Sequence, residues 1–163
     1  MIFKHTFKQI IFSIFFIFIF NSDLIAGTLQ DVNEIVSRSE KPVGVVFEIL
    51  EGKEKDIRWT MNLVNQASQT LKKRFPDIKI AVVSHGGELF AFSKTNKKDF
   101  KKIHSLAEQM NNNDIPVHVC GTHASWRQKS EKDFPSYITV VEAAPAQIAF
   151  YEDLGYQLVI VEK

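Results

Sequence analysis

Apolar and polar positions alternate along most of the chain in blocks of two kinds. Short runs rich in β-branched residues predict strands, because a strand covered on both faces carries a nearly continuous apolar sequence. Longer stretches with apolar residues three or four positions apart predict amphipathic helices. Five strands are expected on this basis, over residues 43–50, 78–84, 116–120, 137–141 and 157–161.

Helices are expected between these strands. The clearest covers 56–75, where one stripe keeps the helical spacing: Ile57, Met61, Val64, Ala67, Leu71 and Phe75. A second begins at Asn96, a short one over 125–134 has capping-box spacing at its start, and a last one ends at Gly155. Strands that alternate with helices predict crossover connections. The expected fold is therefore a single three-layer α/β domain with a mostly parallel five-stranded sheet and helices on both faces.

The N-terminus has the pattern of a secretory signal peptide. Lys4 and Lys8 precede an uncharged run over 10–20, and a small residue, Ala26, follows a polar break. The apolar run is shorter than the roughly 20 residues that span a bilayer. We expect a signal peptide over 1–26, a lead-in segment with one or two helical turns over 27–41, and the α/β domain over 42–163. The predicted location is the periplasm, with a membrane tether by an uncleaved signal as the alternative.

Composition narrows the classes of function. Removal of Lys4, Lys8 and Asp23 with the signal leaves equal numbers of basic and acidic side chains, which disfavours nucleic-acid or anionic-membrane binding. One cysteine in the whole chain excludes an internal disulfide and a Cys-x-x-Cys dithiol. Neither a G-x-G-x-x-G nor a P-loop motif occurs, so no nucleotide and no other cofactor is expected.

The residues that could carry chemistry lie at the carboxyl ends of the predicted strands. They are Glu48, His85, Cys120, His123 and Glu142. Because ligands of open α/β sheets bind outside the carboxyl ends of the strands, we expect these side chains to gather at one edge.

The lone thiol of Cys120 has two interpretations. It is either a small buried hydrophobe or a reactive group. A helix starting near Ser125 would aim its N–H groups toward the thiol, and His123, Arg127 and Lys129 would add positive charge; each effect favours the nucleophilic thiolate. Both interpretations stay open at this point.

A metal site is a further alternative. His118 and Cys120 are two residues apart and share one face of a strand. With His123 and His85 they would supply ligands suited to zinc or copper. The His-x-Cys-x-x-His spacing is not that of a standard closed zinc site, so no metal is assigned. The neighbouring pair at 86–87 is predicted to form a tight glycine turn with positive φ.

Three segments together resemble the DsrE/DsrF-like sulfur-relay family: Val-Val-Phe-Glu-Ile-Leu-Glu-Gly from 45, Val-Val-Ser-His-Gly-Gly from 82 and Val-His-Val-Cys-Gly-Thr from 117. The likeness covers about 42–162, includes Ala-Ala-Pro-Ala-Gln-Ile from 143, and is closest to exported single-domain members. It implies a small α/β fold that assembles as a homo-oligomer, a trimer or hexamer.

The resemblance also implies that Cys120 carries sulfur as a persulfide, in the manner of a persulfide transferase. The partners would be sulfur-donor and sulfur-acceptor proteins or small sulfur compounds. We expect His85 and His123 to set the protonation of Cys120, and Gly121 to admit the partner's sulfur. A non-catalytic metal or small-ligand module, and a structural or assembly protein with a core cysteine, remain the alternatives.

Overall fold

The computed structural model describes residues 26–161, so the predicted signal peptide before Ala26 lies outside the described residues. Five parallel strands form one sheet in the order β4-β3-β2-β1-β5. Their bounds are β1 Gly44–Ile49, β2 Lys79–Ser84, β3 Val117–Cys120, β4 Ile138–Val141 and β5 Tyr156–Val161. The predicted strands are all present within one or two residues of their expected ends.

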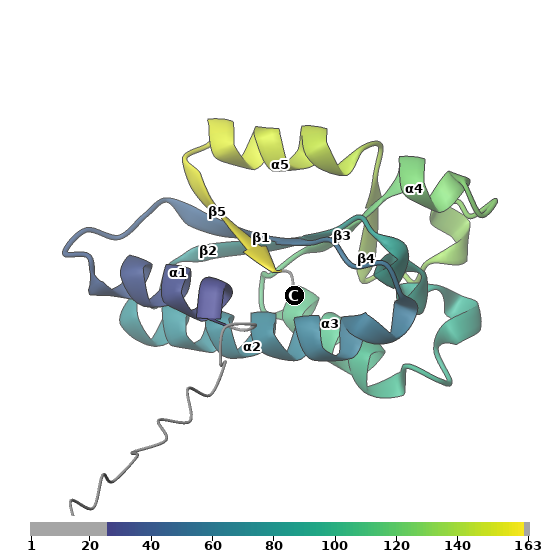
Figure 1. Cartoon of the computed structure of the whole chain (residues 1–163), viewed down its shortest axis with the longest axis horizontal. Helices are drawn as coiled ribbons and strands as arrows, with labels where there is room; N and C mark the ends of the chain where they lie inside the picture. The colour runs from purple at the N-terminus through teal and green to yellow at the C-terminus, as the bar shows by residue number, and fades with distance from the viewer. Residues whose placement is uncertain (1–25, 162–163) are drawn as a thin grey trace, which may run out of the picture.

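Helices cover both faces of this sheet (Figure 1). The helices are α1 Ala26–Ser37, α2 Ile57–Arg74, α3 Lys101–Asn112, α4 Gly121–Ser125 and α5 Ala144–Asp153. In Figure 1, α1, α2 and α3 lie below the sheet, α5 lies above it, and α4 lies at one end. Four short 3-10 turns complete the connections: η1 Glu54–Asp56, η2 Gly87–Phe92, η3 Lys94–Asn96 and η4 Glu131–Asp133. The predicted three-layer α/β class is confirmed.

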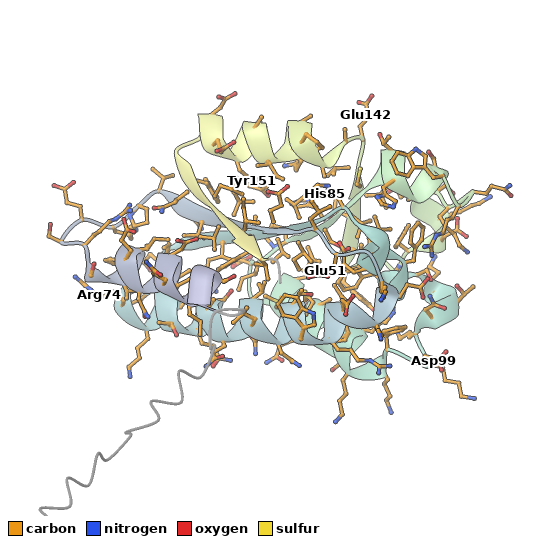
Figure 2. The ribbon with its side chains drawn as sticks, viewed as in Figure 1. Glu51, Arg74, His85, Asp99, Glu142 and Tyr151 are labelled. Atoms are coloured by element: carbon orange, nitrogen blue, oxygen red, sulfur yellow. The ribbon has the colours of Figure 1, made fainter. Side chains whose placement is uncertain are left out.

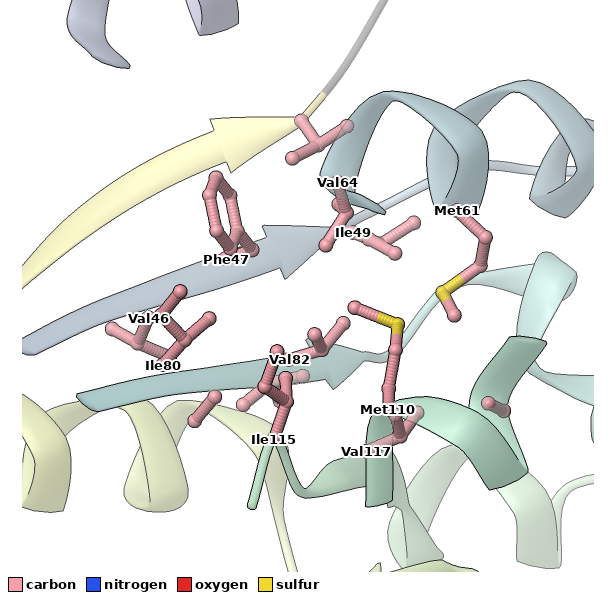
Figure 3. Close-up of a cluster of buried hydrophobic side chains, with 14 of the residues drawn as sticks. Val46, Phe47, Ile49, Met61, Val64, Ile80, Val82, Met110, Ile115 and Val117 are labelled. Carbon is pink, nitrogen blue, oxygen red and sulfur yellow. The ribbon is translucent and has the colours of Figure 1, made fainter. Parts of the chain in front are cut away.

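The core lies mainly between the sheet and the helices of the lower layer. All six residues of the stripe predicted for α2 are buried. Figure 3 shows part of this cluster, in which side chains of β1, β2 and β3 meet Met61 and Val64 of α2 and Met110 of α3. Each fully buried side chain of this kind stabilises the fold by roughly 1.5–3 kcal/mol. This apolar layer holds the strand ends in fixed positions.

The lead-in segment is more ordered than predicted. Instead of one or two turns, α1 is a helix of 12 residues. Val32 and Ile35 are 1% and 0% exposed, because the apolar residues of the segment recur with helical spacing and pack into the core. Thr28 Oγ1 donates a hydrogen bond to the carbonyl of Ile160 at 3.1 Å, which ties the start of α1 to β5. No helix within residues 26–161 is both long and apolar enough to cross a membrane.

Two helix predictions are wrong in their bounds. The helix expected over 125–134 instead starts at Gly121 and ends at Ser125, and Gln128 has a φ of 56°, which no helix continues. The capping box belongs to η4, between Ser130 and Asp133. The helix expected from Asn96 begins only at Lys101. Asn96 instead ends the 3-10 turn η3, and its amide donates a hydrogen bond to the Phe90 carbonyl at 3.0 Å.

Candidate functional site

A pocket of about 260 Å³ opens at the carboxyl edge of the sheet. The turn after β2, the junction of β3 with α4, and the start of α5 form its walls, and most of its surface is apolar. Its lining residues are His85, Cys120, Thr122, His123, Trp126, Ala143 and Pro145. The structure therefore brings together the three side chains that the sequence singled out, Cys120, His85 and His123.

Cys120 occupies the last position of β3 and the N-cap of α4. Its side chain is 5% exposed, and its Sγ accepts a hydrogen bond from the His123 N–H at 3.4 Å. A Cβ at Gly121 would stand 2.8 Å from the Val141 carbonyl oxygen. The glycine therefore lets the chain turn tightly against β4, and its expected role of admitting a partner's sulfur stays a prediction.

His85 is bound to a carboxylate. Its Nε2 lies 2.5 Å from Oε1 of Glu48, a residue of β1, and the two side chains are 16% and 17% exposed. A carboxylate accepts hydrogen bonds and does not donate them, so the ring proton is assigned to Nε2. In the neutral ring, Nδ1 of His85 then keeps a free lone pair. Sequence reasoning placed Glu48 at this edge but gave it no role.

His123 has the complementary arrangement. Its Nδ1 lies 2.6 Å from the backbone carbonyl oxygen of His85, which can only accept, so the proton is on Nδ1 and Nε2 keeps the lone pair. The ring lies against Trp126, with the ring centroids 4.6 Å apart, and against the edge of Phe90 at 5.7 Å. Trp126 itself is 72% exposed and forms the outer rim of the pocket.

The cations expected beside the thiol have other partners. The Arg127 guanidinium lies over the ring of Phe90 and bonds to Glu54 at 2.8 Å. Lys129 lies 3.8 Å from Asp133. The titratable side chains that line the pocket are thus the thiol and the two imidazoles.

A buried carboxyl group fixes the turn that carries His85. Glu88 is 0% exposed and accepts hydrogen bonds from the Ser84 hydroxyl at 2.7 Å and from the backbone N–H groups of Gly86 at 2.9 Å and Glu51 at 2.8 Å. Burial raises the pKa of Glu88 above its ordinary value. The same turn requires glycine at 86 for a reason that the sequence did not reveal.

Gly86 has a φ of −97°, so the predicted positive-φ turn is wrong. Within the described residues, Gly155 is the glycine with positive φ. A Cβ at Gly86 would collide with the backbone of Glu51, and one at Gly87 would collide with Gly52. The pair is therefore needed for close approach of two chain segments, which presses the His85 turn against the loop that follows β1.

His118 is separated from the pocket. It lies in β3 beneath α5, is 7% exposed, and its Nε2 lies 2.8 Å from the hydroxyl of Tyr151. Its Nδ1 has no hydrogen-bond partner, and burial lowers the pKa of His118 to about 4. Within residues 26–161, no cluster of three or more His, Cys, Asp or Glu side chains is arranged to hold a metal ion. The metal alternative therefore gains no support from the geometry.

Glu142, the other acidic residue expected at this edge, makes its contacts here through its backbone carbonyl. The carbonyl of Glu142 accepts hydrogen bonds from the N–H of Thr122 at 3.0 Å and from its hydroxyl at 2.9 Å, which joins β4 to α4. Figure 2 shows Glu142, Glu51 and His85 toward the same end of the molecule. The expected convergence at the carboxyl edge of the sheet is present.

No family model matches the chain, and no curated protein matches it. Solved structures that share its fold include two proteins. The protein of unknown function MTH1491 from Methanobacterium thermoautotrophicum has a TM-score of 0.57 at 16% identity, over 71% of this chain and 96% of that one. The ychN protein from E. coli has a TM-score of 0.53 at 12% identity, over 72% and 98%. At these identities the likeness shows a common fold.

Proposed function

We propose that this protein is an exported sulfur carrier that binds sulfur as a persulfide on Cys120. The observation that carries the proposal is the pocket in which this lone thiol meets two imidazoles, each with one unprotonated ring nitrogen. Such nitrogens accept the proton of a thiol, and the thiolate is the nucleophile in sulfur exchange. The observed α/β fold agrees with the fold that the resemblance to DsrE/DsrF-like proteins implies.

The proposed reaction is a thiol exchange in which atoms and charge balance. A donor persulfide, R–S–SH, loses its terminal sulfur to the Cys120 thiolate, so one S–S bond breaks while another forms. The proton of the Cys120 thiol passes through a pocket imidazole to the departing thiolate, which leaves as R–SH. The product is Cys120–S–SH, and the reverse steps deliver the sulfur to an acceptor thiol.

The biological setting is part of the proposal. The signal pattern over 1–26 supports export to the periplasm. Sulfur-donor and sulfur-acceptor proteins, or small sulfur compounds, would be the partners. The resemblance supports a homo-oligomer, a trimer or hexamer, in which each chain carries one sulfur.

Mass spectrometry after incubation with inorganic polysulfide tests this function. The folded mature protein is expected to gain the mass of sulfur in a form that a reducing agent removes. Cys120→Ser is expected to gain none, because no second cysteine exists to replace it. Equal loading of the variant, or a wild-type protein that takes up no sulfur, would contradict the proposal.

The low exposure of Cys120 favours one alternative, a structural protein in which the cysteine belongs to the core. That alternative predicts a thiol that reacts with iodoacetamide only after denaturation. Labelling of the folded protein, at a rate well above that of its global unfolding, would exclude it.

A further inference from the structure

We infer that Glu48 is a positioning residue, which fixes His85 as the proton acceptor for Cys120. This inference rests on the proposed function, since it assigns the proton path of the same site. The pocket contains two imidazoles, and the structure distinguishes them by their partners. His85 bonds to a carboxylate, whereas His123 bonds to a neutral backbone carbonyl.

The carboxylate has two effects on His85. It holds the proton on Nε2, which leaves Nδ1 as the nitrogen that can accept a proton. It also stabilises the imidazolium ion that forms when that proton arrives, because opposite charges attract strongly where water is scarce. A carbonyl stabilises a charged ring less. His85 is therefore the imidazole suited to hold a proton while the Cys120 thiolate reacts.

The fold gives this pair a rigid base. Glu48 belongs to β1, which pairs with β2 on one side and β5 on the other. His85 follows β2 directly, and its N–H donates to the Ile49 carbonyl at 3.1 Å. The Glu88 hydrogen bonds and the close contact at Gly86 fix the turn from the other side. Neither side chain of the pair lies on a free loop.

Other titratable and charged groups around the pocket lack this arrangement. Thr122, Ala143 and Pro145, contributed by α4 and the start of α5, bring no charge to its wall. The elements around it carry these further titratable or charged groups: Glu51, Glu54, Glu88, His118, His123, Arg127, Glu142 and Tyr151. Arg127 is paired with Glu54, and His118 is paired with Tyr151. The one carboxylate with a hydrogen bond to a pocket imidazole, within the described residues, is Glu48.

The inferred proton path runs between Cys120 and His85, which line the same pocket. The S–H proton of Cys120 moves to Nδ1 of His85, and its bonding electron pair stays on sulfur. The thiolate then attacks the terminal sulfur of the donor persulfide. The proton on Nδ1 finally moves to the departing thiolate, so His85 returns to its neutral form and no oxidant or reductant is consumed.

The pH profile of Cys120 alkylation by iodoacetamide tests the inference without any sulfur substrate. In Glu48→Gln, which keeps the size of the side chain and removes its charge, the midpoint of the profile is expected to rise by about one pH unit. The alkylation rate at neutral pH should fall roughly tenfold. This corresponds to a change of about one pH unit, the smallest usually seen when one close opposite charge is lost. His85→Gln should shift the profile in the same direction. The double variant should equal His85→Gln, because Glu48 acts through His85.

Glu51→Gln is the matched control. It removes the same charge three residues away on the same chain segment, without a hydrogen bond to His85, and its profile should superimpose on that of the wild type. A Glu48→Gln profile equal to the wild type, or additive shifts in the double variant, would overturn the inference. If the alkylation profiles shift as expected but the wild-type protein takes up no sulfur, the proposed function alone would be contradicted.

A second measurement does not depend on any variant. Nitrogen-15 NMR of the His85 ring in the wild-type protein reports which nitrogen carries the proton. The inference requires the proton on Nε2 near neutral pH. A ring with its proton on Nδ1 would overturn it, whatever the alkylation profiles show.

Discussion

His118 and His85 lie on the same face of neighbouring strands, yet their surroundings differ completely. His118 pairs in register with Val83, and His85 follows two residues later, so both rings project toward the α5 layer. Tyr151 of α5 covers His118 and bonds to it. Beyond the N-terminal end of α5, where Pro145 forms part of the rim, His85 faces the pocket. One ring is enclosed and the other is accessible.

The difference teaches that the partner determines what each imidazole does. A phenol hydroxyl on Nε2 and an apolar environment on Nδ1 keep His118 neutral, because nothing nearby compensates a buried positive charge. His85 instead has a carboxylate on Nε2 and borders an open pocket. The enclosed region therefore stabilises the fold, whereas the proposed function assigns the chemistry to the open region.

Truncating each ring to alanine should separate the two roles. The largest expected effect is on the free energy of unfolding. His118→Ala removes a buried ring and leaves the Tyr151 hydroxyl without that partner, so the free energy of unfolding should fall by about 3 kcal/mol. His85→Ala removes a ring at the surface of the pocket and should cost about 1 kcal/mol. Urea denaturation of both variants measures the difference.

The reactivity of the thiol should follow the opposite order. Alkylation of Cys120 should slow in His85→Ala and keep its wild-type pH profile in His118→Ala, as long as the latter is folded. Equal losses of stability in the two variants, or equal changes in reactivity, would show that the two regions do not have separate roles.

Acid should lower the free energy of unfolding through His118, the buried histidine of the enclosed region. The pKa of His118 is lowered to about 4 in the folded protein, while its ordinary value is 6.5, so only the unfolded chain binds the proton between these two values. Stability is therefore lost as the pH falls from 6.5 to 4. This one group should make the free energy of unfolding about 2 kcal/mol smaller at pH 5 than at pH 7.

The control for this prediction is His118→Leu, which keeps an apolar side chain of similar size and has no proton to bind. Its loss of stability between the two pH values should be smaller than that of the wild type by the same amount. Burial also lowers the pKa of His104 and raises that of Glu88, but both groups are present in each protein and cancel in the comparison. Parallel pH curves for the two proteins would contradict the assignment.

The sequence predicted most of the fold because the fold depends on local periodicity. The stripe of α2 and the apolar runs of the central strands reflect burial on one face or on two, and such patterns are visible along the chain. The bounds of α4 were not predicted, because its N-cap is Cys120, and cysteine is not a residue whose pattern marks the start of a helix. The reason for glycine at position 86 was predicted wrongly. The backbone that excludes a Cβ there belongs to Glu51, in another loop.

The candidate site was predicted in its members but not in its organisation. Parallel strands bring His85, Cys120 and His123 to one edge of the sheet. That they share one pocket depends on β2 and β3 being neighbours, an order that the sequence did not establish. To tell the role of His85 from that of His118, one must know where Tyr151 lies. This residue is 33 positions from His118 in the sequence, on a helix. The role of Glu48 likewise depends on a contact 37 residues apart in sequence, which composition and spacing do not reveal.

Trp126 offers the smallest and most specific test, at the outer edge of the open region. Its ring is 72% exposed and lies against His123, so Trp126→Ala should change the free energy of unfolding by no more than about 0.5 kcal/mol. The variant removes part of the pocket rim, and Cys120 should therefore react faster, with a larger gain for a bulky maleimide than for iodoacetamide. The ratio of the two rates, measured beside a thermal melt, separates access from stability. If both reagents gain equally, Trp126 affects the opening of the whole turn and not the width of the pocket, and the open region would then owe its accessibility to local unfolding.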